Sequence, residues 1–141
     1  MQQGAAIDAS AKQAGDGGEV ILFSDERTEF GGTIYANGAG IFGNGGFVET
    51  SGKNALESYG SVEAVAGGAQ GNAGTWLLDP SSITIGGTAG ITSTGTNPIT
   101  FDGAGGGTNV LASSINTALG NGTSVIVTTG LLAAGGTVIL P

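Results

Sequence analysis

The chain has no cysteine and no histidine, and it has very few basic residues. Without those two side chains it has no disulfide scaffold, thiol chemistry, zinc-finger ligation or histidine-based catalysis. Its basic residues are Lys12, Arg27 and Lys53, which stand against 11 acidic residues and leave a net charge of −8. Because phosphate binding requires clusters of Lys and Arg, the sequence predicts that nucleic acid is not a partner.

Proline and long apolar runs are also scarce. The chain has 3 prolines and no Gly-X-Y period, which excludes collagen. No stretch reaches about 18 apolar residues, so we expect no membrane insertion as a helix. Residues 1–4 resemble no signal peptide, and any export signal is expected outside this chain. What is abundant is glycine, at 30 of 141 residues, in a chain that is 39% hydrophobic and therefore unlike a disordered polymer.

Three glycine-rich segments, residues 15–20, 43–48 and 71–76, begin at equal intervals along the chain. Each follows one short β-like run and precedes another. The runs before the glycines are 6–9, 33–36 and 61–64, and those after them are 20–23, 47–50 and 75–78. Such a unit cannot bury its own apolar side chains, but stacked copies can. The sequence therefore predicts an all-β fold, a parallel β-helix (β-solenoid) with about 28-residue repeats. At one strand spacing of about 4.8 Å per coil, 141 residues would give about five coils and a rod roughly 25 Å long.

The glycines of these segments are predicted to be structural turn residues with positive φ. The set comprises Gly15, Gly18, Gly43, Gly46, Gly71 and Gly74, and Asp79 with Pro80 is predicted to end a strand in the same structural way. Asp16, Asn44 and Asn72 recur at one turn position, but the nine-residue period of a calcium β-roll is absent. We therefore predict no metal site and no cofactor.

After Pro80 the pattern becomes less regular, although residues 1–141 are still expected to form one solenoid. Residues 1–80 carry the regular repeats. Residues 81–141 are nearly uncharged, with strands expected at 82–85, 98–101, 124–128 and 136–140. A short helix is predicted near 110–119, because Leu111, Ile115 and Leu119 have the spacing of one helix face. We expect this apolar stripe to pack the helix against the flank of the solenoid.

Aromatic residues are read mainly as interior groups. Trp76 takes the place that Val20 and Val48 hold in the other repeats, so we expect it inside the coil with its N–H bonded to a carbonyl. The alternative is a surface platform for stacking sugars. Phe23 and Phe47, together with Phe42, are expected to fill the core or its corners. Asn121, in the sequence Asn-Gly-Thr, is a candidate glycosylation site in a loop.

The carboxylates allow a test of the idea that the protein is an enzyme. Glycoside hydrolysis needs two carboxyl groups about 5–10 Å apart. Candidates are Asp25, Glu26 and Glu29 in one polar stretch, and Glu49, Glu57 and Glu63 later in the chain. We interpret residues 25–29 as a solvated turn in which Arg27 pairs with Glu26 or Glu29. The sequence thus predicts no enzyme, and a glycan-active β-helix enzyme remains a remote alternative.

Two pairs of strings carry a resemblance to a known family. Residues 46–52, Gly-Phe-Val-Glu-Thr-Ser-Gly, and residues 74–80, Gly-Thr-Trp-Leu-Leu-Asp-Pro, resemble segments of the filamentous-haemagglutinin-like large exoproteins. Residues 7–10, and 116–119 followed by 122–125, are similar to neighbouring stretches of that family. The resemblance implies a right-handed parallel β-helix in the shaft of an adhesin that is secreted by two-partner secretion and lies at the bacterial cell surface. The chain departs from the family in its small size and in lacking the Asn-Pro-Asn secretion module.

Charge is distributed very unevenly along the chain. Ten of the 11 acidic residues and all three basic residues lie in positions 1–80, and Asp102 is the only charged residue after that. Open solenoid ends are unpaired sheet edges, which proteins ordinarily cap or charge. We therefore expect a structural or adhesive module that associates head to tail or continues into a larger exoprotein. A host-cell or glycan surface is a candidate partner, and a glycan- or protein-binding module without self-assembly is the alternative.

Overall fold

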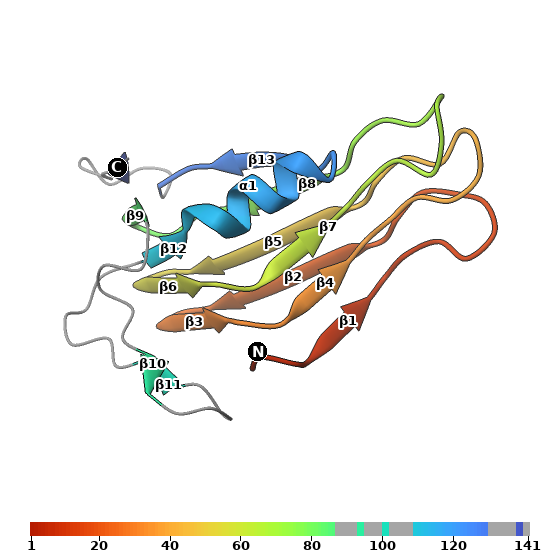
Figure 1. Ribbon diagram of the computed structural model, residues 1–141. Helices are drawn as coiled ribbons and strands as arrows, with labels where there is room; N and C mark the ends of the chain where they lie inside the picture. The colour runs from red at the N-terminus through yellow and green to blue at the C-terminus, as the bar shows by residue number, and fades with distance from the viewer. Residues whose placement is uncertain (87–92, 95–99, 102–108, 130–137, 140–141) are drawn as a thin grey trace.

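The structure, a computed structural model, describes residues 1–86, 93–94, 100–101, 109–129 and 138–139 (Figure 1). Three parallel sheets, each built from strands of successive turns, form the faces of a β-solenoid. The first face contains β1 (Ala6–Asp8), β4 (Thr33–Tyr35) and β7 (Ser61–Glu63). The second contains β2 (Glu19–Ser24), β5 (Phe47–Gly52), β8 (Thr75–Leu78) and β13 (Ser124–Val127). The third contains β3 (Arg27–Phe30), β6 (Ala55–Ser58), β12 (Asn109–Leu111), β9 (Ile83–Gly86) and β14 (Val138–Ile139).

The register of the strands confirms the predicted solenoid and its repeat. On the first face Ile7 lies opposite Ile34, and Ile34 lies opposite Val62. On the second face Val20, Val48 and Trp76 are in register, each one sequence repeat after the last. Because the strands of these two faces pair with their counterparts one turn later, backbone hydrogen bonds run from turn to turn along the stack.

Strands β3 and β6 correct the interpretation of residues 25–29 as a solvated turn. Arg27–Phe30 is a strand, paired in parallel register with Ala55–Ser58. Thr28 and Phe30 point into the core, whereas Arg27 and Glu29 point outward. The alternation was hidden because the outward positions and the preceding Asp25 and Glu26 make the stretch look uniformly polar.

The prediction of about five successive coils is wrong for the described part of the chain, in which about three turns follow one another. On the third face β12 lies between β6 and β9, so a later segment occupies the place beside the second turn. Helix α1 (Ala112–Gly120) follows β12 and packs against β7, and β13 then adds a fourth strand to the second face. Strands β10 (Ser93–Thr94) and β11 (Thr100–Phe101) form a short antiparallel pair. Strand β11 is part of the strand expected at 98–101. The rest of that strand, and most of the strand expected at 136–140, lie outside the described residues.

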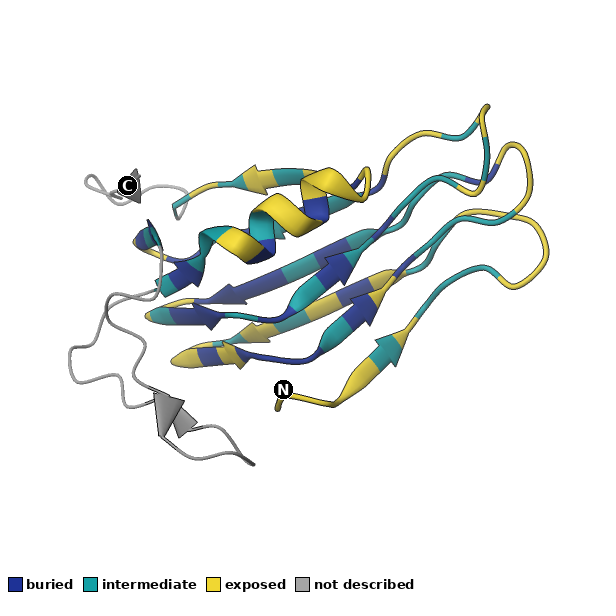
Figure 2. Ribbon diagram, viewed as in Figure 1, coloured by how far each residue is buried: buried dark blue, intermediate teal, exposed yellow. Residues whose placement is uncertain are grey.

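The core lies between the three faces, and burial is greatest in the middle turns (Figure 2). Its aliphatic and aromatic members come from every turn: Val20, Phe30, Ile34, Val48, Leu56, Val62, Trp76, Leu78, Ile83, Ile85 and Val110. Buried residues alternate with more exposed ones along strands such as β3, β8 and β9, which is the pattern of a sheet with one buried side.

The helix begins slightly later than expected, and its buried stripe is different. Ser114 and Ala118 are the buried residues, whereas Leu119 is 52% exposed. The predicted stripe is therefore wrong at Leu119, although Ile115 is half-buried and packs against the core. Small side chains on the buried side allow the helix to come close to β7, and this need for close approach outweighs the preference for burying leucine.

Candidate functional site

The glycine turns are structural, but the reason differs from the one the sequence predicted. Of the six predicted positive-φ glycines, only Gly15 has a positive φ, of 122°. Gly43, Gly46, Gly71 and Gly74 are instead required by close backbone contact with the turn before, whereas Gly18 lies against Ala9 of its own turn. At Gly46 a Cβ atom would lie 2.1 Å from the carbonyl oxygen of Gly18, and at Gly74 it would lie 2.3 Å from that of Gly46. Glycine therefore recurs at the same places of successive repeats because the turns touch through their backbones.

Asp16, Asn44 and Asn72 form a polar ladder on these turns. The backbone N–H and the side-chain Nδ2 of Asn44 both donate to Asp16 Oδ1, at 2.7 and 3.0 Å. Asn72 makes the same two bonds to Asn44 Oδ1, at 2.8 and 2.9 Å. Asp16 and Asn44 thus each accept two hydrogen bonds from the next turn, which fixes the spacing and register of the loops.

Asp79 and Pro80, the predicted strand end, also join separate parts of the chain. The backbone N–H of Asp79 donates to Ser51 Oγ at 3.2 Å. The hydroxyl of Thr128 donates to Asp79 Oδ1 at 2.5 Å, and Pro80 is buried. Asp79 therefore connects the third turn both to the turn before it and to the end of β13.

The predicted core aromatics occupy three different environments. Trp76 is fully buried; its Nε1–H donates to the hydroxyl of Thr50 at 2.9 Å instead of to a carbonyl, and its ring meets Phe30 edge-on at 6.3 Å. Phe47 is half-buried. The prediction for Phe23 is wrong, since it is 56% exposed, and that for Phe42 is wrong too, since it is 72% exposed. Phe23 lies at an outward position of the first strand of its face, and Phe42 lies on a loop.

A cluster of charged and phenolic side chains lies on the outside of the third face. Glu29 and Glu57 are directly opposite each other on β3 and β6. Arg27 pairs with Glu57 at 2.5 Å, so the predicted pairing with Glu26 or Glu29 is wrong, and Glu57 is only 3% exposed. The Tyr59 hydroxyl donates to Glu29 Oε1 at 2.9 Å. Burial raises the pKa of Tyr59 well above its usual range, and Glu29 and Glu57 raise it further, so the phenol stays neutral.

This cluster is a poor acid–base site. Glu57 Oε2 has no hydrogen-bond partner within the described part of the chain and is shielded from solvent. A hydrolytic carboxyl group must reach the glycosidic oxygen or a water, which the burial of Glu57 opposes. The arrangement is better suited to holding β3 against β6 than to catalysis.

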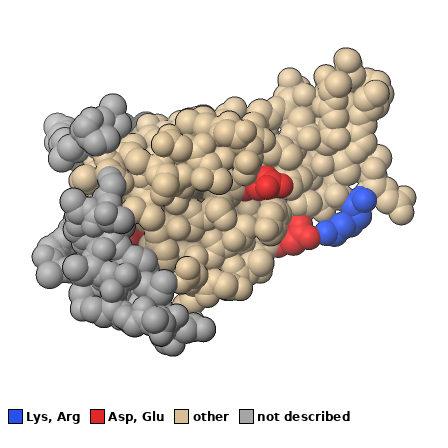
Figure 3. Space-filling view, in the orientation of Figure 1, with Lys and Arg blue, Asp and Glu red and all other residues tan. Residues whose placement is uncertain are grey.

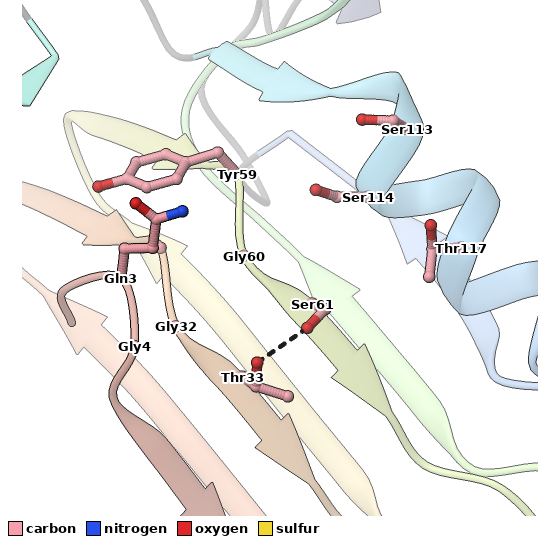
Figure 4. A pocket seen from close by; sticks show the side chains of 11 residues that line it. Gln3, Gly4, Gly32, Thr33, Tyr59, Gly60, Ser61, Ser113, Ser114 and Thr117 are labelled. Carbon is pink, nitrogen blue, oxygen red and sulfur yellow. Dashed lines mark hydrogen bonds between the residues drawn. The ribbon is translucent and has the colours of Figure 1, made fainter. Parts of the chain in front are cut away.

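A groove of about 340 Å³ lies between α1 and the corners that join the third face to the first (Figure 4). Its polar lining consists of Gln3, Thr33, Tyr59, Ser61, Ser113, Ser114 and Thr117, and its remaining walls are glycines. In the described part of the molecule, the face that carries α1 and β7 shows few charged side chains (Figure 3). Sequence reasoning missed this groove because its hydroxyl groups come from segments far apart in the chain, and single Ser and Thr residues give no local signal.

Asn121 is exposed at the C-terminal end of α1, while Thr123 of the same sequon is buried and accepts a hydrogen bond from the backbone N–H of Ala64 at 2.9 Å. Glycosylation of Asn121 stays a prediction. Among the described residues no cluster of three or more potential metal ligands occurs. The same residues include no helix that is long and apolar enough to cross a membrane.

No protein-family model matches this chain, and a search of curated proteins finds no match either. The likeness to filamentous-haemagglutinin-like exoproteins therefore still depends on the sequence strings alone.

Proposed function

We propose that this chain is a structural and adhesive module that extends by pairing its open solenoid edge with a further β-coil. Continuous parallel ladders would make a stiff shaft, and the flanks of the shaft would offer contact surface. The resemblance in the sequence supports a setting at the bacterial cell surface, reached by secretion.

The observation that carries the proposal is the outer edge of β2. The backbone N–H of Phe47 donates to Gly18 O at 3.1 Å, and that of Lys53 donates to Ser24 O at 2.9 Å. By the alternation of a parallel ladder, the N–H and C=O groups of Glu19, Ile21 and Phe23 then point away from β5. No other described strand pairs with this side of β2.

The composition of β2 also favours pairing. Proteins usually protect an exposed edge with proline, lysine or a bulge. Strand β2, Glu19–Ser24, has none of these along its regular register with β5. Its outward side chains include Ile21 and Phe23, both more than half exposed. Such an edge is suited to accept another strand, either from the same protein or from a second copy.

The test compares two substitutions at one residue. Ile21→Pro removes an N–H that points to the open edge but none that β5 uses, so the variant should fold. Ile21→Ala removes the exposed side chain but keeps the N–H, and it serves as the matched control. We would examine both, with the original chain, by negative-stain electron microscopy and light scattering over a concentration series, after circular dichroism has established folding.

Unbranched fibres of uniform width for the original chain and for Ile21→Ala, with monomers for Ile21→Pro, would support the proposal. Monomers of the original chain at every concentration would contradict end-to-end pairing. Fibres that persist in Ile21→Pro would show that assembly uses another surface.

A further inference from the structure

The groove beside α1 exists because a helix takes the place where a fourth strand of the first face would lie. Neighbouring strands are about 4.8 Å apart, whereas a helix with its side chains is about 10 Å across. Helix α1 therefore cannot follow the sheet closely along its whole length. It packs against β7, and Ser113, Ser114 and Thr117 of the helix line an opening together with the corners at residues 31–33 and 59–61. The opening left there has a volume of about 340 Å³, within the range of small-molecule pockets.

The chemistry of the lining is uniform. Six side chains carry hydroxyl groups, one carries a carboxamide, and none of the lining residues is charged. Hydroxyl and carboxamide groups can both donate and accept hydrogen bonds. A phosphate, a carboxylate or a cation would find no opposite charge in the lining, whereas the hydroxyl groups of an uncharged molecule would find donors and acceptors there.

Two hydrogen bonds hold the lining in position before any ligand arrives. The Ser61 hydroxyl donates to Thr33 Oγ1 at 3.1 Å, so the Thr33 proton is directed elsewhere and the Ser61 oxygen can accept a bond (Figure 4). The Tyr59 hydroxyl is held by Glu29 on the outer side, which fixes the ring beside Gln3 at one end of the groove. A fixed aromatic ring offers a flat apolar surface to the C–H face of a sugar.

The floor is bare backbone. Gly31, Gly32 and Gly60 contribute no side chains, and none of them has room for one. A Cβ atom at Gly31 would lie 2.1 Å from the ring of Tyr59, and one at Gly60 would lie 2.5 Å from the carbonyl oxygen of Gly32. The corners therefore pack too closely for side chains at these positions, and their part of the lining is main chain.

From this geometry we infer that the groove between α1 and the corners at residues 31–33 and 59–61 binds a neutral saccharide of one or two rings. The site lies on the flank of the solenoid and not on the open edge of β2. Binding therefore does not require assembly, and this inference goes beyond the proposed shaft function without depending on it.

The test uses the full chain labelled with ¹⁵N, titrated separately with galactose, N-acetylglucosamine and lactose, and observed through its amide resonances. Saturable shifts centred on Gly31, Gly32 and Gly60 are expected with at least one of the sugars. Ser113→Ala, on the exposed side of the groove, should weaken the apparent Kd about three- to tenfold through the loss of one hydrogen bond. Ser113→Phe should fill the opening and abolish the shifts. Ser124→Ala, an exposed hydroxyl on β13, is the control and should change nothing.

The inference is overturned if none of the three sugars shifts the floor glycines, or if the shifts survive Ser113→Phe. A response to an uncharged Ser- and Thr-rich peptide, with none to the sugars, would overturn it as well and would make the groove a peptide site. Repeating the titration with Ile21→Pro separates this result from fibre formation, because the groove should bind equally well in a chain that does not assemble.

Discussion

The hydrogen bond between Trp76 and Thr50 allows the interior of the solenoid to be tested by a double-mutant cycle. Both side chains are fully buried, and the Trp76 Nε1–H donates to Thr50 Oγ1 at 2.9 Å. Thr50→Val keeps the shape of the side chain but leaves that N–H without its partner in a dry core. An unpaired buried donor costs about 1–3 kcal/mol. We therefore expect the free energy of unfolding to fall by about 2 kcal/mol.

Trp76→Phe supplies the second side of the cycle. It removes the N–H together with part of the ring and should cost about 2–3 kcal/mol, less than a full truncation to alanine. In that background Thr50→Val leaves no donor unpaired, so its own cost should shrink. The expected coupling energy between the two positions is about 1–2 kcal/mol, typical of residues in direct contact.

The assay is urea unfolding of the four proteins followed by far-ultraviolet circular dichroism. Trp76 is the only tryptophan, so its fluorescence gives an independent curve for Thr50→Val. Thr75→Val, at an outward position of β8, is the matched control and should change stability by no more than about 0.5 kcal/mol. A coupling energy below about 0.3 kcal/mol, or equal effects of Thr50→Val and Thr75→Val, would refute the account of the buried hydrogen bond.

Two further predictions concern the turns and the surface. Gly46→Ala should lower the free energy of unfolding by about 3 kcal/mol or more, because the new Cβ would meet the carbonyl oxygen of Gly18 at 2.1 Å. Gly120→Ala, with nothing within 4 Å, should be neutral or slightly stabilising in the same urea titration, and equal losses at both sites would contradict the close-contact explanation. The hydrogen bond from Lys12, and to a smaller extent those from Ser10, lower the pKa of Asp8 to about 2. The pair should therefore stabilise the fold fully at pH values above the ordinary carboxyl pKa of about 3.9. This contribution should be lost as the pH falls through 2. A side-chain NMR titration should show the Asp8 pKa rising towards its ordinary value in Lys12→Met; an unchanged pKa would mean that Lys12 is not the cause.

The repeats of positions 1–80 could be predicted because each of their features lies within a short stretch of sequence. Strands with β-branched centres alternate with glycine blocks, and equally spaced copies can bury their apolar side chains only by stacking. The strands on the first two faces follow this rule closely. Strand β3, Arg27–Phe30, was not predicted, because its outward residues are charged and make the stretch look like a polar turn. The inward Thr28 and Phe30 were therefore not recognised as core positions.

Other features depend on contacts between distant segments. Position 76 lies in register with Val20 and Val48, and this alignment was enough to place Trp76 inside. The same alignment also places Phe23 outward, because it lies three residues after the inward Val20 and neighbouring side chains of a strand point to opposite sides. The groove beside α1 was not predictable, since the residues that line it come together only after the helix has packed.

The amino-acid sequence by itself determined the β-solenoid, its repeat and the positions of its glycine turns, because these follow from local spacing and the need to bury apolar side chains. Only the tertiary structure decided that β12 lies between β6 and β9 and that α1 takes the place of a strand on the first face. The physical reason is that parallel strands offer the same backbone hydrogen bonds to any segment that reaches them. Which segment does so depends on how the whole chain packs.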